Sequence, residues 1–179
     1  KRWRQFLAVM NLYQFCEGFT FWATSEVAGE TAPELPLPGC GSAACTCQFR
    51  GLHDLVIVDT PPKVDADLRP ALRESDLVIV PVAASQVDVW ATESVLDLAR
   101  RERRPVLVVL NRAKAGTRVL AEVAGAIAEL DAIQAETVIG NRVAYAETLG
   151  QGRGVLERGK GAWTAEINGL TDEVRSHLD

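Results

Sequence analysis

Three short apolar runs constrain the fold of this chain more than any other feature of its sequence. They occupy residues 55–58, 77–80 and 105–110, and they are rich in β-branched residues, with a proline opening the third. A strand with one solvated face would alternate polar and apolar residues, so an uninterrupted apolar run indicates a strand that is buried on both faces. Such strands belong to parallel sheets that are covered by helices, and the chain therefore predicts an α/β fold.

Segments with helical periodicity separate these strands and continue to the end of the chain. In the segment after the second strand, apolar residues that include Val87, Trp90 and Val95 recur at helical spacing. We expect Pro81 to end the second strand and Thr117 to cap a helix. The alternation predicts βαβ units with right-handed crossovers. The predicted helices are 66–74, 87–103, 117–130, 143–149 and 163–178, and a fourth strand is predicted at 135–139.

The sequence changes character near residue 50, so we treat residues 1–50 and 51–179 separately. Periodicity is poor before this point, and the proline- and glycine-rich residues 34–41 are typical of an extended loop. Residues 1–50 hold four basic and four acidic side chains, so the net charge of −5 comes from residues 51–179. A chain with this charge is not a polycation that coats nucleic acid.

All four cysteines lie within the first 47 residues, at spacings that do not indicate a structural zinc site. Cys40, Cys45 and Cys47 form C-x4-C-x-C rather than C-x2-C pairs, and neither histidine completes a zinc knuckle. We therefore expect these cysteines and Cys16 to be free thiols, as in cytosolic proteins. Residues 1–23 superficially resemble a signal or anchor segment, but polar residues interrupt the apolar run, which favours a cytoplasmic protein without a membrane segment.

Candidate binding residues follow the predicted strands directly, because ligands of open α/β sheets bind outside the carboxyl ends of the strands. The first strand ends at Asp59, followed by Thr60 and Pro61. A carboxylate at the tip of a buried strand is costly unless a cation such as Mg²⁺ or a set of hydrogen-bond donors meets it. The third strand ends at Asn111 and Arg112, and an asparagine amide either pairs with an adenine edge or forms a turn.

Four motifs in residues 51–179 resemble, in the same order, motifs of the ParA/MinD-type (deviant Walker A) P-loop ATPases. The resemblance is to small ParA-like partition proteins, and it implies a P-loop NTPase-like parallel sheet with helices on both faces. The motifs are a switch strand (54–62), the segment that follows it (81–92), an adenine-side strand (108–112), and a late nucleotide-proximal loop and helix (139–147 with 152–157).

The resemblance also implies a site and partners. Asp59 would be the catalytic switch acid, which meets Mg²⁺ through water, and Asn111 and Arg112 would flank the adenine of ATP. Arg142 would lie near the base-binding loop. The implied activities are ATP-dependent homodimerisation, non-specific DNA binding and binding of a ParB-like partner, in plasmid or chromosome partition or in positioning another cargo. The implied nucleotide-binding residues are Asp59, Thr60, Pro61, Asn111, Arg112 and Arg142.

The phosphate-binding loop of the family, Lys-Gly-Gly-x-Gly-Lys-[Ser/Thr], has no counterpart in residues 1–50, which contain a single lysine, Lys1. We therefore expect the N-terminal strand and loop to be missing or replaced; a truncated or frame-shifted gene would explain this. A near match at residues 154–161 has Gly161 where a hydroxyl is needed and follows a helix. The chain is expected to be inactive as an ATPase, and the alternative is a non-catalytic α/β interaction module that has lost ATP.

Two expectations concern the surface and the order of the chain. Ser85 and Asp88 match a motif of the family and are expected to cap a helix. Without the first strand, residues 1–50 would pack irregularly, unless residues 5–12 or 19–24 form a strand that covers the open sheet edge. An arginine cluster lies at the end of the predicted helix 87–103 and is either a solvated helix end or a DNA-contacting patch. It consists of Arg100, Arg101, Arg103 and Arg104.

Overall fold

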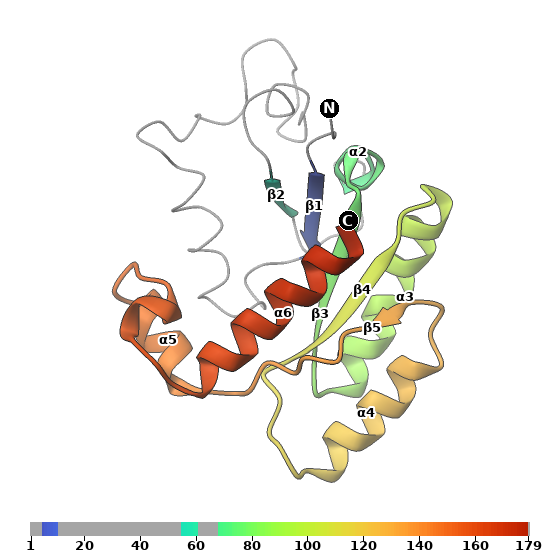
Figure 1. Ribbon diagram of the computed structural model, residues 1–179. Coiled ribbons are helices and arrows are strands. Elements are labelled where there is room, and N and C mark those ends of the chain that lie inside the picture. The colour runs from blue at the N-terminus through green and yellow to red at the C-terminus, as the bar shows by residue number, and fades with distance from the viewer. Residues whose placement is uncertain (1–4, 11–54, 61–67, 179) are drawn as a thin grey trace.

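Five parallel strands form one sheet in the order β2-β1-β3-β4-β5, which confirms the predicted α/β fold (Figure 1). The computed structural model describes residues 5–10, 55–60 and 68–178. The strands are β1 (Gln5–Met10), β2 (Leu55–Thr60), β3 (Leu77–Ala83), β4 (Val106–Asn111) and β5 (Ile133–Gln134).

β1 lies inside the sheet, with a neighbour on each side. Its six residues pair with Leu55–Thr60 of β2, and its residues Leu7 to Val9 pair with Leu77 to Ile79 of β3. The N-terminal strand is therefore not missing: Gln5–Met10, part of the segment 5–12 that we expected could form a strand, takes the inner position. The apolar run from Phe6 to Met10 is no shorter than the runs at 55–58 and 77–80, but Val9 is its single β-branched residue, so its pattern did not indicate a buried strand. Two flanking strands favour an extended segment there because it satisfies their backbone groups. The remaining calls on residues 1–50 lie outside the described residues.

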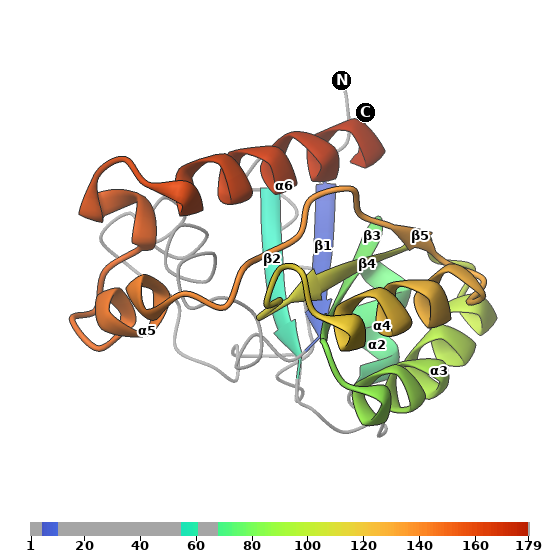
Figure 2. The ribbon, with the colours of Figure 1, turned by 90° about the horizontal axis from the view of Figure 1, so that it is seen from below.

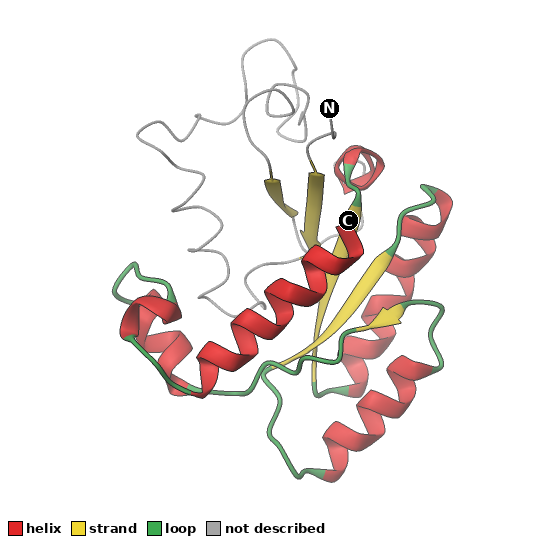
Figure 3. Cartoon of the chain, in the orientation of Figure 1, coloured by secondary structure: helices red, strands yellow, loops and turns green. Residues whose placement is uncertain are grey.

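The helices cover both faces of the sheet, as the resemblance implied (Figure 2). α6 lies on one face and α3 and α4 lie on the other. The helices agree with the predicted segments within a few residues, and the short 3-10 helix η2 was not predicted (Figure 3). They are α2 (Leu68–Glu74), α3 (Gln86–Arg101), α4 (Arg118–Ala128), α5 (Val143–Leu149), η2 (Val155–Arg158) and α6 (Ala162–Leu178).

Successive residues of the inner strands belong to two separate hydrophobic cores. Leu77 and Ile79 of β3 pack with residues of α5 and α6, whereas Val78 and Val80 pack with α2, α3 and α4. All four side chains are buried. The uninterrupted apolar run in this part of the sequence therefore has the cause that we predicted, which is burial on both faces of the strand.

β3 does not end at Pro81, as predicted, but continues to Ala83. The amide of Val78 donates to the carbonyl of Pro105, on the β4 side, so the missing N–H of Pro81 falls on the opposite side of the strand. Pairing with β1 on that side ends at Ile79. The proline therefore removes no hydrogen bond from the described sheet, which is the condition under which strands tolerate it.

The strand predicted at residues 135–139 is displaced to Ile133–Gln134. The amides of Ala135 and Ile139 still donate to carbonyls of β4, at 2.8 and 2.9 Å. Between them, the amides of Glu136 and Thr137 donate instead to the carboxylate of Glu173 in α6, at 2.8 and 2.7 Å. A regular ladder cannot form where two successive amides turn to a side chain, so the strand ends early.

The buried face of α3 differs from the predicted one. Val87 and Trp90 are 66% and 62% exposed. The helix carries two apolar stripes, and the one that faces the sheet includes Thr92, whose hydroxyl donates to the carbonyl of Asp88. The buried residues of this face are Val89, Thr92, Val95, Leu96 and Ala99.

A proline in β1 tests the place of this strand in the sheet. Ala8 pairs with Val58 on one side and Val78 on the other. Ala8→Pro should therefore leave a carbonyl of a neighbouring strand unpaired, at about 1–3 kcal/mol, and add a steric clash. We expect a large loss of stability in urea unfolding followed by circular dichroism.

Gln134→Pro is the matched control, because the N–H of Gln134 points away from β4 and its loss breaks no pairing with that strand. It should change the unfolding midpoint little. Equal midpoints for Ala8→Pro and the unmodified chain would contradict a central β1.

Candidate functional site

The carboxyl ends of the strands place the predicted site residues along one edge of the sheet. Asp59 of β2 is level with Val9 of β1, which is level with Ile79 of β3. Further along, Ala83 of β3 is level with Asn111 of β4. The backbone of Asp59 and Thr60 therefore lies on the same edge as Asn111, with two strands between β2 and β4. The side chain of Asp59 and the whole of Pro61 lie outside the described residues.

Asn111 stabilises the turn that follows β4. Its side chain is buried, and its Oδ1 accepts a hydrogen bond from the amide of Arg112 at 2.9 Å. Arg112 has a φ of 51°, in the left-handed region, where a non-glycine residue costs about 1 kcal/mol or more. The role visible in the structure is thus to hold this turn, in which Arg112 is exposed.

A second segment joins this turn and brings Arg142 toward it. Ala113 and Gly140 form a parallel β-bridge, in which the amide of Ala113 donates to Ile139 and the amide of Asn141 donates to Ala113. The stretch that ends β4 and the stretch that begins α5 are therefore connected by backbone hydrogen bonds. The structure thus brings the segments of Asn111, Arg112 and Arg142 together.

Arg142 is held in place by Glu166 of α6. The Nε and Nη2 atoms of Arg142 donate to Oε1 of Glu166, at 2.9 and 2.5 Å. The other oxygen accepts from the hydroxyl of Tyr145 at 2.7 Å and from the amide of Gly140 at 3.3 Å. Burial opposes ionisation of Glu166, but these hydrogen bonds outweigh it and lower the pKa of the carboxyl. The hydrogen bond to Glu166 raises the pKa of Arg142.

Sequence reasoning missed Glu166 and Glu173, which both act on the segment beside β4. Their hydrogen-bond partners lie 21 to 37 residues away in the sequence. Glutamates are common on the solvated faces of helices, so the sequence around Glu166 and Glu173 does not distinguish them from ordinary surface glutamates. Their roles depend on the docking of α6, which local patterns do not encode.

The two predicted caps behave differently. Ser85 is the N-cap of α3, and its carbonyl accepts from the amides of Asp88 and Val89, but its hydroxyl makes no capping bond within the described residues. Asp88 lies in the first turn of α3, where a carboxylate complements the helix dipole. The predicted cap Thr117 accepts a hydrogen bond from the amide of Leu120 at 3.4 Å.

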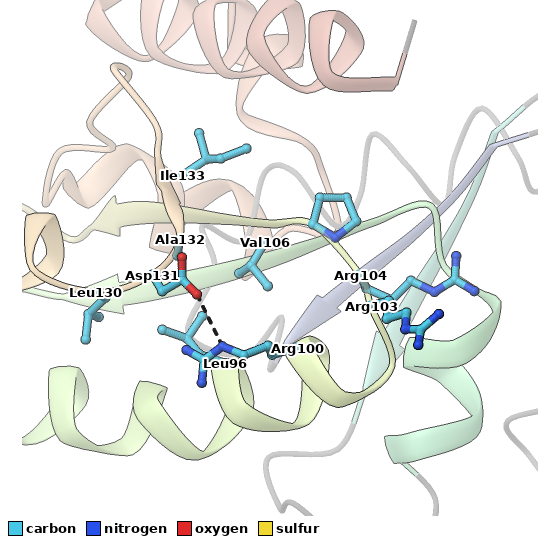
Figure 4. A pocket seen from close by; sticks show the side chains of 10 residues that line it. Leu96, Arg100, Arg103, Arg104, Val106, Leu130, Asp131, Ala132 and Ile133 are labelled. Carbon is cyan, nitrogen blue, oxygen red and sulfur yellow. Dashed lines mark hydrogen bonds and ion pairs between the residues drawn. The ribbon is translucent and has the colours of Figure 1, made fainter.

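The arginine cluster lies at the opposite, amino edge of the sheet. Arg100 donates to Asp97 and to Asp131. Three of the four arginines, Arg100, Arg103 and Arg104, line a cavity of about 560 Å³ between the end of α3 and the segment before β5 (Figure 4). Arg104 donates to the carbonyl of Arg73 in α2, while its Nε is buried without a hydrogen-bond partner among the described residues.

α2 adds two arginines near this cluster. Arg69 and Arg73 both donate to the carboxylate of Glu102, and the bond from Arg69 is the main cause of a lowered pKa for Glu102. α3 also ends two residues earlier than predicted, since Arg103 has a φ of 56°. Part of the positive charge at this edge is therefore neutralised within the fold.

The glycine-rich residues 154–161 form no phosphate-binding loop. The amide of Gly154 donates to Glu157, and the amide of Gly161 donates to the hydroxyl of Thr164. The run contains η2 and leads from α5 into α6, so no strand precedes it. The amides of Gly154 and Gly161 are thus already hydrogen-bonded to side chains of this chain, in agreement with the expectation that this run is not a phosphate-binding loop.

In the described part of the chain, no three His, Cys, Asp or Glu side chains converge as a metal site. No helix of that part is long and apolar enough to cross a membrane. The four cysteines lie outside the described residues.

No protein-family model matches the sequence, but one curated protein is similar to it. This is Maintenance of carboxysome distribution protein A of Halothiobacillus neapolitanus, which is 28% identical over 130 residues, covering 68% of this chain. The chain spans 60% of the length of that relative.

Solved structures of the ParA/MinD type have the same fold. The MinD cell division protein of Aquifex aeolicus has a TM-score of 0.69 at 12% identity, covering 97% of this chain and 84% of its own. A plasmid partition protein of Borrelia burgdorferi bound to AMPPNP has a TM-score of 0.56 at 14% identity, covering 96% of this chain and 88% of its own. A ParA family ATPase of Chlorobium tepidum has a TM-score of 0.53 at 15% identity, covering 89% of this chain and 80% of its own. The resemblance read from the sequence is thereby confirmed at the level of the fold.

Variants at the turn after β4 test the role of Asn111. Asn111→Ala should destabilise the chain by about 1–3 kcal/mol, because it leaves buried polar groups without their partner. Arg112→Gly should be more stable than Arg112→Ala by about 1 kcal/mol, because glycine adopts a positive φ without strain. Urea unfolding measures both differences. Equal stability of the two Arg112 variants would show that this turn is not left-handed in solution.

Proposed function

We propose that this chain, which has the ParA/MinD-type ATPase fold, is a ParA-like protein of plasmid or chromosome partition or of cargo positioning. The observation that carries the proposal is the carboxyl edge of the sheet. There the segments of Asn111 and Arg142 join at the bridge between Ala113 and Gly140, in a sheet in which β1 is one of the inner strands. The similarity to Maintenance of carboxysome distribution protein A supports the positioning role.

The residues present do not fit the triphosphate of ATP. In P-loop folds, a glycine- and lysine-rich loop follows the strand that occupies the place of β1 and cradles the phosphates. Here the chain after β1 begins Asn11-Leu-Tyr-Gln14, and residues 5–49 contain four glutamates and no lysine or arginine. Such a segment offers no cation to offset a polyphosphate. We therefore propose that this chain does not turn over ATP.

The base side of the site remains as the proposed adenine-binding region. Asn111, Arg112 and Arg142 lie on segments that hydrogen bonds connect, and Arg112 and Arg142 are exposed. Asp59, with Thr60 and Pro61, is the proposed Mg²⁺-linked position at the end of β2, and it would need a phosphate loop to act. The comparison with a neighbour bound to AMPPNP supports a nucleotide site of this kind.

The proposed partners follow from the same resemblance. They are a second copy of the chain, non-specific DNA and a ParB-like partition protein, in the cytoplasm. Val87 and Trp90 are exposed apolar residues in the first turns of α3, close to the carboxyl edge, and exposed apolar side chains are frequent in protein interfaces. They are our candidates for contact with another protein chain. The alternative of a non-catalytic α/β interaction module that has lost ATP binding is not favoured, since the neighbours are partition proteins and ATPases.

ATP hydrolysis by the purified chain tests the loss of the phosphate site. We expect no Mg²⁺-dependent turnover, because charge stabilisation and positioning supply most of phosphoryl-transfer catalysis. Phosphate release is the measurement. Turnover that Asp59→Ala abolishes would disprove the proposal and reveal a different phosphate site.

Grafting a phosphate loop from a related protein after β1 separates the two proposed roles. In this chimera, Asp59→Ala should mainly remove hydrolysis. Asn111→Ala should mainly weaken adenine nucleotide binding, by roughly 1–3 kcal/mol. Isothermal titration and phosphate release measure the two effects. Equal losses of affinity in both variants would contradict these assignments.

DNA binding should be weak, independent of sequence and strongly salt-dependent. The four arginines of the cluster would give a log–log salt slope of roughly −3 to −4. Arg101 and Arg103 form no ion pair among the described residues, so their double alanine variant should remove about half of this slope. Fluorescence anisotropy at several salt concentrations measures it. Binding that survives the quadruple alanine variant would place the site elsewhere, with Arg153, Arg158 and Lys160 as the next candidates.

A further inference from the structure

We infer that Glu166 of α6 is a positioning residue for the base-side loop, residues 139–142, whereas Glu173 on the same helix serves only to close the sheet edge. The functional importance of the loop rests on the proposed function. The division of roles between the two glutamates rests on the hydrogen bonds alone.

Glu166 and Glu173 lie on the same face of α6, because seven residues are close to two helical turns. The segment 135–140 lies between this face and β4. On one side, the amides of Ala135 and Ile139 donate to carbonyls of β4. On the other side, the amides of residues 136, 137 and 140 donate to the two carboxylates of α6. The helix therefore satisfies backbone groups that a further strand would otherwise pair.

α6 is itself fixed to the sheet by its apolar face. Ile167, Leu170 and Val174 are buried in the core that contains Leu77 and Leu107. Glu166 precedes the first of these anchors directly. A carboxylate on a helix that is packed in this way has a defined position, and groups that bind it are fixed relative to the sheet.

Glu166 receives three different donors from the loop region, and Glu173 receives none of these. The donors are the amide of Gly140, the guanidinium of Arg142 and the hydroxyl of Tyr145. Glu173 binds the amides of Glu136 and Thr137 and the hydroxyl of Thr137, at the far end of the segment from Arg142. Of the two glutamates, only Glu166 therefore holds Arg142 and the amide of Gly140.

Gly140 adds a steric reason for the same conclusion. A Cβ atom at this position would lie 3.0 Å from Oε1 of Glu166 and 3.1 Å from Nε of Arg142. These distances are shorter than ordinary carbon–oxygen and carbon–nitrogen contacts, so a side chain at this position would displace the carboxylate or the guanidinium by a few tenths of an ångström. The ion pair and the glycine together fix the loop against α6.

The test compares Glu166→Gln with Glu173→Gln, which remove one charge each from the same helix face. Amide hydrogen exchange and the ¹⁵N resonance of Arg142 Nε report the loop directly. Adenosine is the binding probe, because it carries no phosphate. In Glu166→Gln, exchange at Gly140 and Asn141 should accelerate and adenosine affinity should fall, each about tenfold. In Glu173→Gln, exchange should accelerate at Glu136 and Thr137 and leave the loop and adenosine binding unchanged.

Two outcomes separate the inference from the function on which it rests. If both variants loosen Gly140 and shift the Arg142 resonance equally, Glu166 has no special positioning role and the inference is wrong. If the unmodified chain shows no resonance shifts with adenosine, the proposed base site is wrong, and the exchange pattern alone still decides the positioning role. Gly140→Ala should reproduce the Arg142 shift of Glu166→Gln, and an unchanged resonance would also contradict the inference.

Discussion

The pairing of β1 with strands on both sides holds the described sheet together. β2 is connected to the other strands through β1, so the place of Asp59 relative to Asn111 depends on this pairing. Inside a sheet that is covered by helices, backbone groups have no water to bind, and each must find a partner in a neighbouring strand. This requirement explains why Gln5–Met10, which has a single β-branched residue, takes the inner position.

At the β5 edge of the sheet, backbone amides find their hydrogen-bond partners in side chains rather than in a neighbouring strand. β5 has only two residues, and the chain beyond it leaves the regular ladder. Carboxylates of α6 then accept the outward amides of residues 136, 137 and 140. Charged acceptors form stronger hydrogen bonds than carbonyls do, so two glutamates can replace the pairing of several residues. One consequence is that the loop carrying Arg142 is attached to a helix as well as to the end of β4.

The sequence predicted those parts of the fold that depend on local pattern. The inner strands were read from their uninterrupted apolar runs, and Asn111 and Arg112 were found because strand ends carry ligands in such sheets. The errors have a common cause, since each depends on what lies beside the segment in space. Pro81 is tolerated because its side of β3 lacks pairing there. Val87 and Trp90 are exposed because the other stripe of α3 faces the sheet, and Glu166 acts through residues far along the chain.

The charges at the carboxyl edge decide which part of a nucleotide it suits. Of the cations placed there, Arg142 is already paired with Glu166, and the lowered pKa of Glu166 keeps that pair ionised at neutral pH. Arg112 and Lys114 are exposed cations of the loop that follows β4. The pairing of Arg142 with Glu166 reduces the positive charge on the base side, which is why we propose an uncharged nucleoside rather than a polyphosphate as its ligand.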